Sequence, residues 1–346
     1  MKSLTVCCLT FTIIMTTPFV TSYAAPPTGK DEQCGTFDDV TMNRCDPPLI
    51  NLAEGRDFRA SESCSDGQRY KEITYVQDPV TSEFATELRR CKGRDAHPVS
   101  HLTDPSGPNV TYWQSNSMSS LDEREVTLTL SFRKSYEISY VFLKFWSIRP
   151  RAMAIYKSMN HGKSWTAFQY FAIDCEHYFD QKASEVRKSP QEVLCTQKYS
   201  EPLPFRYGEV VFNPVPNGSP DDLDNKFYLQ EWVTATDIKL KFISLNNPLL
   251  RREPLRPVNG EISAQDPPTT PLNPDPSPFF YAVSDIHIGA RCKCNGHGSS
   301  CVKRNGAIRC ECRHNTFGVN CEKCRNNFND RPWLRATKDN PNQCVR

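Results

Sequence analysis

The stretch Arg291-Cys-Lys-Cys-Asn-Gly-His-Gly-Ser-Ser-Cys301 begins a C-terminal segment, residues 291–346, that holds eight of the 16 cysteines of the 346-residue chain. Their spacing is Cys292-x1-Cys294-x6-Cys301-x8-Cys310-x1-Cys312-x8-Cys321-x2-Cys324-x19-Cys344. The segment has few large apolar side chains, so hydrophobic burial alone cannot hold it in one fold. We therefore expect a small module held by disulfides, although eight cysteines can pair in many ways and spacing does not choose among them.

The N-terminus indicates the compartment in which such disulfides form. Residues 1–24 combine Lys2, a mostly apolar run and the small residues of Ser22-Tyr-Ala24, which is typical of a secretory signal peptide. A transmembrane anchor is the alternative, but the run is short and rich in threonine, and no later segment could span a membrane. Removing residues 1–24 leaves 14 cysteines, an even number that suits an oxidising compartment. Asn109, in Asn109-Val-Thr111, is a predicted glycosylation site.

Residues 25–290 predict an all-β domain. Val126, Leu128, Leu130 and Phe132 alternate with polar residues, as expected of a half-buried strand. Similar short runs occur at 140–146, 152–156, 167–173, 209–212, 238–243 and 279–288. Many short strands without helical periodicity favour an antiparallel β-sandwich. Nine prolines between Pro248 and Pro278 exclude a central strand there, and the stretch reads as a long loop or as an interdomain linker.

The residues between the C-terminal cysteines carry a family resemblance. Together with the stretch quoted first, His314-Asn-Thr-Phe-Gly-Val-Asn-Cys-Glu-Lys-Cys324 and Asp330-Arg-Pro-Trp-Leu-Arg-Ala-Thr337 resemble a laminin-type EGF-like module. Upstream, Tyr281-Ala-Val-Ser-Asp-Ile-His-Ile-Gly-Ala-Arg-Cys292 and Leu229-Gln-Glu-Trp-Val-Thr-Ala-Thr-Asp-Ile238 resemble a laminin N-terminal domain. The resemblance covers nearly all of the mature chain, and Asp330–Thr337 together with Gly162-Lys-Ser-Trp165 favours netrins within this family. It implies a jelly-roll β-sandwich at 25–290 and one EGF-like module at 291–346.

The resemblance also implies how the cysteines of the module pair. In the EGF-like module the order is one to three, two to four, five to six and seven to eight. This gives Cys292–Cys301, Cys294–Cys310, Cys312–Cys321 and Cys324–Cys344. In the larger domain we expect Cys175–Cys195, and proximity in the sequence suggests Cys34–Cys45 and Cys64–Cys91.

A structural calcium ion is a further implication of the resemblance. It would lie near Leu102-Thr-Asp-Pro-Ser-Gly-Pro-Asn-Val-Thr111, with Asp104 as the carboxylate ligand. Thr111 and Ser284 match the remaining protein ligands, and His101 matches the position that offers a backbone carbonyl. Calcium prefers several oxygen ligands of these kinds. The alternative interpretation of Asp104 is an ordinary turn-forming acid.

No catalytic motif stands out in the sequence. It has no His-Glu-x-x-His, Gly-x-Ser-x-Gly or phosphate-loop pattern. Cys175 lies among titratable residues, but in an oxidising compartment we expect it to form a disulfide rather than act as a nucleophile. A zinc site that adds His297 and His314 to the cysteines is weakened in the same way by complete cysteine pairing. We expect the protein not to be an enzyme.

The charge is unevenly divided along the chain. The formal net charge of +2 gives no reason to expect nucleic acid as a partner. Residues 291–346, however, hold 12 Lys and Arg against four Asp and Glu, a net of +8, whereas the rest of the chain carries a net of −6. These basic residues either form a solvated surface or face an anionic partner such as heparan sulfate or an acidic receptor patch. The candidates are Lys303, Arg304, Arg309, Arg313, Lys323 and Arg325.

The sequence thus predicts a secreted protein of the extracellular matrix or basement membrane. The netrin resemblance implies a ligand that binds immunoglobulin- and fibronectin-type receptor ectodomains and guides axons or migrating cells. The alternative is a structural role, in which the N-terminal domain associates with those of laminins to build or modulate basement-membrane networks. Residues 68–90 and 251–278, where receptor contacts would be expected, have no recognisable motif.

Overall fold

The computed structural model describes residue 34 and residues 44–64, 67–78, 83–93, 96–104, 110–118, 124–189, 191–216, 220–224, 226–246 and 279–346. The predicted signal peptide at 1–24, the glycosylation site at Asn109 and the proline-rich stretch from Pro248 to Pro278 lie outside these residues. None of the helices in the described ranges is long and apolar enough to cross a membrane.

Antiparallel strands build the larger domain, as the alternating pattern predicted. Ten strands pair in the order β1-β12-β6-β11-β7-β8-β9, while β2 and β10 also pair with β6 and β5 pairs with β12. The strands are β1 (Ile50–Asn51), β2 (Arg59–Ala60), β5 (Trp113–Gln114), β6 (Val126–Phe145), β7 (Ala152–Ser158), β8 (Thr166–Ala172), β9 (Cys195–Thr196), β10 (Gly208–Phe212), β11 (Thr234–Ser244) and β12 (Ala282–Cys292). Only the short β8–β9 ladder among them is parallel. The all-β prediction is confirmed.

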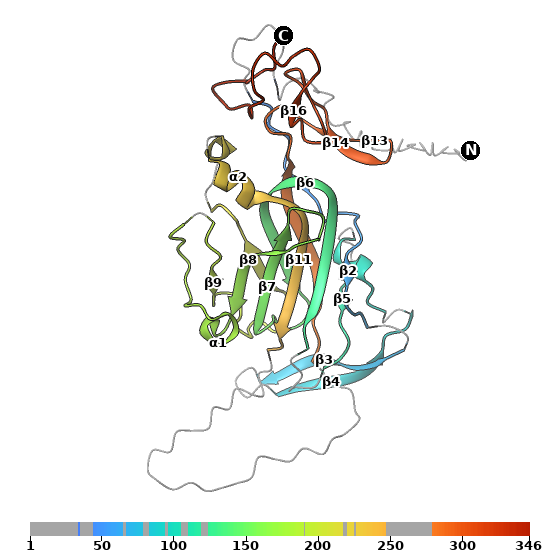
Figure 1. The fold of residues 1–346 in the computed structure, drawn as a ribbon. Coiled ribbons are helices and arrows are strands. Elements are labelled where there is room, and N and C mark those ends of the chain that lie inside the picture. The colour runs from blue at the N-terminus through green and yellow to red at the C-terminus, as the bar shows by residue number, and fades with distance from the viewer. Residues whose placement is uncertain are drawn as a thin grey trace, which may run out of the picture.

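Strand β6 joins the two layers of the sandwich. Its first part, from Val126, pairs with β11, and its last part, up to Phe145, pairs with β12 and β10. Between the two parts the β11 ladder skips from Ser131 to Tyr136, and Arg133 has a φ of 60°. Figure 1 shows β6 turning over at this point, at the end of the sandwich that faces the C-terminal module. One continuous strand therefore contributes to both layers.

The core lies between these layers and is apolar. Leu128, Leu130 and Phe132 from the first part of β6 are buried, and so are Leu143 and Phe145 from the second. Full burial of one such side chain contributes about 1.5–3 kcal/mol. The alternation along β6 thus places one face in the core over most of its length.

Two short α-helices lie at the edges of the sheet, and the sequence did not predict them. Helix α1 (Cys175–Phe179) begins at Asp174, whose side chain accepts a hydrogen bond from the backbone N–H of His177. Helix α2 (Phe227–Val233) ends at the buried ammonium of Lys157 on β7, which donates to the carbonyls of Glu231, Trp232 and Thr234. A cation at this end of a helix satisfies carbonyls that have no partner within the helix. Within the described ranges there are also two 3-10 helices, η2 (Val99–Leu102) and η3 (Pro220–Leu223).

Residues 69–78 and 83–90, where receptor contacts were expected, form a pair of strands rather than loops. Strands β3 (Arg69–Asp78) and β4 (Glu83–Arg90) pair with each other and with no other strand among the described residues. Tyr70 anchors the hairpin, since its buried ring packs edge-on against Phe280 with centroids 5.7 Å apart. The hairpin lies at the end of the sandwich far from the C-terminal module (Figure 1).

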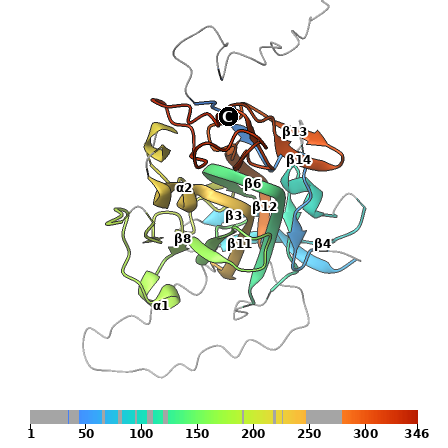
Figure 2. The ribbon, with the colours of Figure 1, turned by 45° about the horizontal axis from the view of Figure 1, so that its top comes forward.

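The C-terminal module has little regular structure. Its strands are β13 (Cys301–Arg304), β14 (Ala307–Cys310), β15 (Thr316–Phe317) and β16 (Lys323–Cys324), which form two small antiparallel pairs. Figures 1 and 2 show the module seated on the end of the sandwich at which β6 bends, with the β13–β14 hairpin projecting to one side. Strand β12 runs directly into it and ends at Cys292.

Candidate functional site

Asp104 and Thr111, two predicted calcium ligands, lie together in the structure. The Thr111 hydroxyl donates a hydrogen bond of 2.7 Å to Oδ2 of Asp104. The residues that connect them, 105–109, are outside the described ranges. A carboxylate beside a hydroxyl offers the hard oxygen ligands that suit calcium.

The other two predicted ligands lie on neighbouring elements. His101 belongs to η2, which contacts β12, the strand that carries Ser284. The His101 ring lies 3.2 Å from the Tyr112 carbonyl through Nδ1, so its imidazole already has a partner. Ser284 is buried, and its hydroxyl donates to the Lys144 carbonyl at 3.2 Å, which leaves the oxygen lone pairs available to a cation. These oxygen atoms are of the right kind for calcium.

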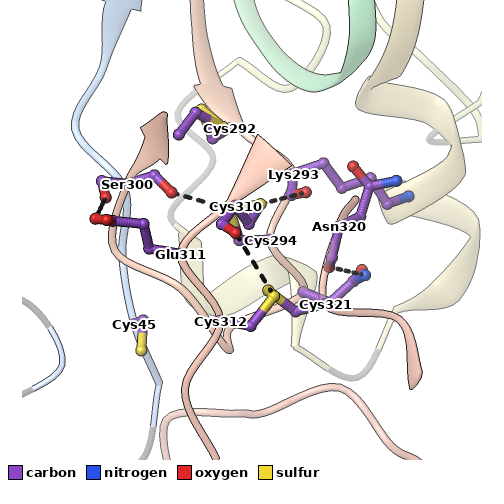
Figure 3. The surroundings of a disulfide bond; sticks show 12 residues. Cys45, Cys292, Lys293, Cys294, Ser300, Cys310, Glu311, Cys312, Asn320 and Cys321 are labelled. Atoms are coloured by element: carbon purple, nitrogen blue, oxygen red, sulfur yellow. Dashed lines mark hydrogen bonds between the residues drawn. A yellow bond between two sulfur atoms is a disulfide. The ribbon is translucent and has the colours of Figure 1, made fainter. Parts of the chain in front are cut away.

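The disulfides in the structure have the pairing that the resemblance and sequence proximity suggested. In the larger domain the pairs are Cys34–Cys45, Cys64–Cys91 and Cys175–Cys195. In the module they are Cys292–Cys301, Cys294–Cys310, Cys312–Cys321 and Cys324–Cys344. Figure 3 shows how closely the module cysteines gather, with Ser300 beside them donating a hydrogen bond of 2.6 Å to Glu311. With so little apolar core, these bonds contribute stability by restricting the unfolded chain.

The same bonds remove two alternative chemistries. Cys175 is joined to Cys195, so it is not a nucleophile, and the neighbouring Asp174 caps helix α1. Cys294, Cys301 and Cys310 lie close enough to hold a metal ion, but all three are in disulfides. A thiolate zinc site is therefore absent from the described residues.

His297 and His314 bond to each other inside the module. Their Nδ1 atoms lie 3.0 Å apart, and Nε2 of His297 lies 2.9 Å from the Leu334 carbonyl. The carbonyl can only accept, so Nε2 of His297 carries the proton, its Nδ1 accepts, and Nδ1 of His314 donates. Burial lowers the pKa of His297 to about 4, and burial together with Arg313 lowers the pKa of His314. The pair is structural and requires a neutral His297.

The junction between the domain and the module is built around Lys134, at the bend of β6. Its side chain is buried, and Nζ donates to the Lys293 carbonyl at 2.9 Å, to Oδ1 of Asn320 at 2.5 Å and to the Ser135 carbonyl at 3.3 Å. Burial lowers the pKa of Lys134 to about 7, while the nearby carboxylate of Glu137 opposes this. The bend of the sandwich strand is thus bonded directly to two segments of the module.

Two largely buried ion pairs lie near the junction, one across it and one within the larger domain. Across it, Arg335 of the module forms a 2.8 Å ion pair with Glu137 of β6, and only 12% and 11% of their side chains are exposed. Within the larger domain, Arg44 pairs with Asp224 at 2.7 Å, and both side chains are more than 90% buried. The second carboxylate oxygen of Asp224 accepts a hydrogen bond of 2.7 Å from the backbone N–H of Lys338. Two separate segments, one with Arg44 and one with Arg335 and Lys338, therefore meet at acids of the larger domain.

Gly296 allows the module to approach the N-terminal segment. It has a φ of 73°, and a Cβ there would lie 2.5 Å from the Ala336 carbonyl oxygen. Its own carbonyl accepts a 2.9 Å hydrogen bond from the backbone N–H of Cys45. A side chain at this position would be strained and would collide with the backbone.

The six basic residues predicted to face an anionic partner do not all lie together. Arg304, Arg309, Arg313 and Arg325 line one groove of about 590 Å³ on the module. Lys303 and Lys323 are exposed but are not among the residues that line it. The structure thus separates the predicted set into four arginines and two lysines.

Sequence reasoning missed the junction residues Lys134, Glu137, Asp224 and Arg335. A signal for the first was present, because the period-two pattern that buries Leu128, Leu130 and Phe132 predicts an inward-facing residue at 134 as well. A lysine at an inward position indicates a partner. The acids gave no local signal, since their cations come from distant parts of the chain.

Comparisons with known proteins match both parts of the chain. The family model described as Laminin N-terminal (Domain VI) matches residues 45–290, and the model Laminin/attractin EGF domain matches residues 292–337. The chain is 36% identical to laminin subunit gamma-1 of Danio rerio over 337 residues, covering 94% of this chain and 20% of that protein. It is 36% identical to laminin subunit gamma-1 of Homo sapiens over 318 residues, covering 87% of this chain and 18% of the relative.

Laminin subunit gamma-3 of Mus musculus is 35% identical over 315 residues, with coverage of 87% of this chain and 18% of that subunit. The chain therefore spans about a fifth of the length of these relatives. Among solved structures, a chitosan-binding module from Paenibacillus sp. IK-5 superposes with a TM-score of 0.32 and 11% identity, covering 69% of this chain and 98% of that one. The three relatives are laminin subunits, whereas the motifs in the sequence had favoured netrins.

Substitution of Arg335 by alanine tests the junction. It leaves the buried carboxylate of Glu137 without its ion-pair partner, and we expect the free energy of unfolding to fall by about 3 kcal/mol. The matched control is Arg331→Ala, four residues earlier, where 57% of the side chain is exposed and the change should stay within about 0.5 kcal/mol. Urea denaturation followed by circular dichroism measures both. If the two substitutions lowered the free energy of unfolding equally, the Glu137–Arg335 ion pair would not stabilise the junction.

The histidine pair predicts acid sensitivity of the module. The pKa of His297 is about 4 in the folded chain, against about 6.5 when unfolded, so protonation favours the unfolded state. Stability is fully present above pH 6.5 and declines as the pH falls towards 4, by about 3 kcal/mol over the whole interval. Urea midpoints between pH 7.5 and 4.5 measure this decline.

His297→Gln should flatten that dependence even if the variant is less stable overall. His287→Gln, which removes an exposed imidazole on β12, is the control and should keep the wild-type profile. The interpretation fails if His297→Gln and the wild type lose stability in parallel as the pH falls.

Proposed function

The chain belongs to the laminin N-terminal (domain VI) family, and from this premise we propose that it acts as a structural component or modulator of the basement membrane by associating with laminin-type N-terminal domains. The observation that carries the proposal is the match of residues 45–290, together with 36% identity to a laminin gamma subunit across 94% of the chain. Family membership also confirms the expected extracellular location, secreted and in the matrix.

The arrangement of the two parts supports this role. The module is held to the sandwich by Lys134, by the largely buried Glu137–Arg335 ion pair and by the hydrogen bond from the Lys338 backbone to Asp224. Buried charged contacts fix orientation more than they add stability. The junction therefore holds the sandwich in a fixed orientation relative to the module. A fixed orientation suits a protein that assembles with others.

Guidance of axons or cells through netrin-type receptors remains a hypothesis. It came from motifs within the shared family, and the relatives reported above are laminin subunits. The absence of enzyme activity likewise stays a prediction. The structural role requires binding to laminin, whereas guidance requires binding to a receptor ectodomain. A binding assay can therefore distinguish the two.

Binding of the secreted chain to immobilised laminin tests the proposal. We expect saturable binding to intact laminin and none to a laminin fragment that lacks the N-terminal domains. A parallel surface carries immunoglobulin- and fibronectin-type ectodomains of a netrin receptor. Binding to the receptor but not to laminin would overturn the structural role and support guidance instead.

We also propose that Asp104, Thr111 and Ser284, with the backbone carbonyl of His101, hold a structural calcium ion. The support is the 2.7 Å contact between Asp104 and Thr111, the packing of η2 on β12, and oxygen ligands of the kinds that calcium prefers. When bound, the ion would tie the loop after η2 to the last strand of the domain.

Chelation tests this calcium site. A ligand present at a hundred times its Kd adds about 2.7 kcal/mol, so EDTA should lower the Tm of the wild type by roughly 5 °C or more. Asp104→Asn keeps an acceptor for Thr111 but removes the charge, and its Tm should not respond to EDTA. Asp57→Asn, at an exposed acid, should respond like the wild type. Equal responses of all three proteins, or none in the wild type, would exclude the site.

A further inference from the structure

We propose that the groove on the EGF-like module binds a sulfated glycosaminoglycan chain, a ligand class beyond association with laminins. Its volume is about 590 Å³, and arginines dominate its lining. The lining residues are Arg304, Arg309, Cys310, Glu311, Cys312, Arg313, Thr316, Phe317, Gly318, Val319 and Arg325.

The register of the β13–β14 hairpin puts two arginines on one face. Val302 is opposite Arg309 and Arg304 is opposite Ala307, so the side chains of Arg304 and Arg309 point to the same side of the hairpin. Lys303 lies between them in the sequence but points to the other side, because successive side chains alternate. The alternation along the hairpin therefore places Arg304 and Arg309 in the groove and Lys303 outside it.

Arg325 completes the groove from a separate segment. Its backbone N–H donates to the Asn315 carbonyl at 2.8 Å, and its Nε donates to the Thr316 carbonyl at 3.2 Å. These bonds fix the direction of the side chain, and the disulfides Cys294–Cys310, Cys312–Cys321 and Cys324–Cys344 hold its surroundings. The Arg325 side chain is therefore largely positioned before any ligand arrives, which lowers the entropic cost of binding.

The groove has an excess of positive charge. Glu311 is the one acid among the described residues that line it, and it accepts from Ser300 at 2.6 Å and from Arg304 at 3.3 Å. Within the described ranges, neither Arg309 nor Arg325 forms an ion pair, and both are exposed. An anionic ligand could contact them without displacing an acid of the protein.

The chemistry of the lining favours a sulfated polysaccharide over an acidic protein surface. A guanidinium group can donate two parallel hydrogen bonds to two oxygens of one sulfate group, a geometry that lysine does not offer. The exposed side chains of Phe317 and Val319 add apolar surface on which sugar C–H groups can rest. A concave groove admits a narrow linear chain, whereas a specific protein interface usually needs about 800 Å² on each partner.

A charge-matched pair of variants tests the proposal on the full secreted chain. Arg309→Ser/Arg325→Ser removes two charges from the groove, and Lys303→Ser/Lys323→Ser removes two charges outside it. Binding to immobilised heparin is measured by surface plasmon resonance at about 0.15 M salt. We expect the arginine variant to bind about tenfold more weakly than the wild type and the lysine variant less than about threefold more weakly.

Equal losses in the two variants would show attraction by net charge alone and would overturn the groove as a site. Lack of heparin binding by the wild type at this salt concentration would overturn it as well. Immobilised polyglutamate represents an acidic protein surface, and stronger binding to it than to heparin would mean that an acidic protein is the ligand.

All four substituted side chains are exposed, so both variants should fold, and equal Tm values verify this. The laminin assay is independent, so either proposal can fail alone.

Discussion

The buried ammonium of Lys134 is the interaction on which the arrangement of the two parts depends. It lies where β6 turns from one layer of the sandwich to the other, and it donates to acceptors on Lys293 and Asn320 of the module. Taking a lysine out of water is costly, and burial lowers its pKa to about 7. The cost is offset only because three acceptors meet at Nζ, which requires the bend and the two module segments to be in place together.

Charged residues join the sandwich to the module beside a small apolar contact, in which Cys294, Cys310 and Cys321 of the module pack with the core of the sandwich. A disulfide module has little further apolar surface to offer, and Arg335 and Lys338 meet Glu137, Asp221 and Asp224. Replacing buried ion pairs by apolar residues is often neutral or favourable for stability, so their main effect is to fix orientation. The apolar core between the layers supplies the stability that these contacts do not.

The sequence predicted those parts of the fold in which burial follows a simple period. The alternation from Val126 to Phe132 and the run ending at Phe145 both lie in β6, although they were expected as separate strands. The β3–β4 hairpin was missed because, in the part of the chain that the structure describes, its strands pair only with each other, and much of it is polar, as in the opposed Glu72 and Glu87. Asp104 and Thr111 are close in sequence and were found together, while their relation to Ser284 depends on packing that no local pattern encodes.

The structure explains part of the uneven division of charge between the larger domain and the module. The acids of the larger domain are not spread uniformly, because Glu137, Asp221 and Asp224 gather at the junction. Basic residues of the module divide accordingly, with Arg335 and Lys338 at those acids and Arg309 and Arg325 on a different face, in the groove. Local attraction to the acids accounts for the first group but not for the second. Part of the positive charge of the module, at Arg309 and Arg325, is therefore left without an acidic partner among the described residues of the sandwich.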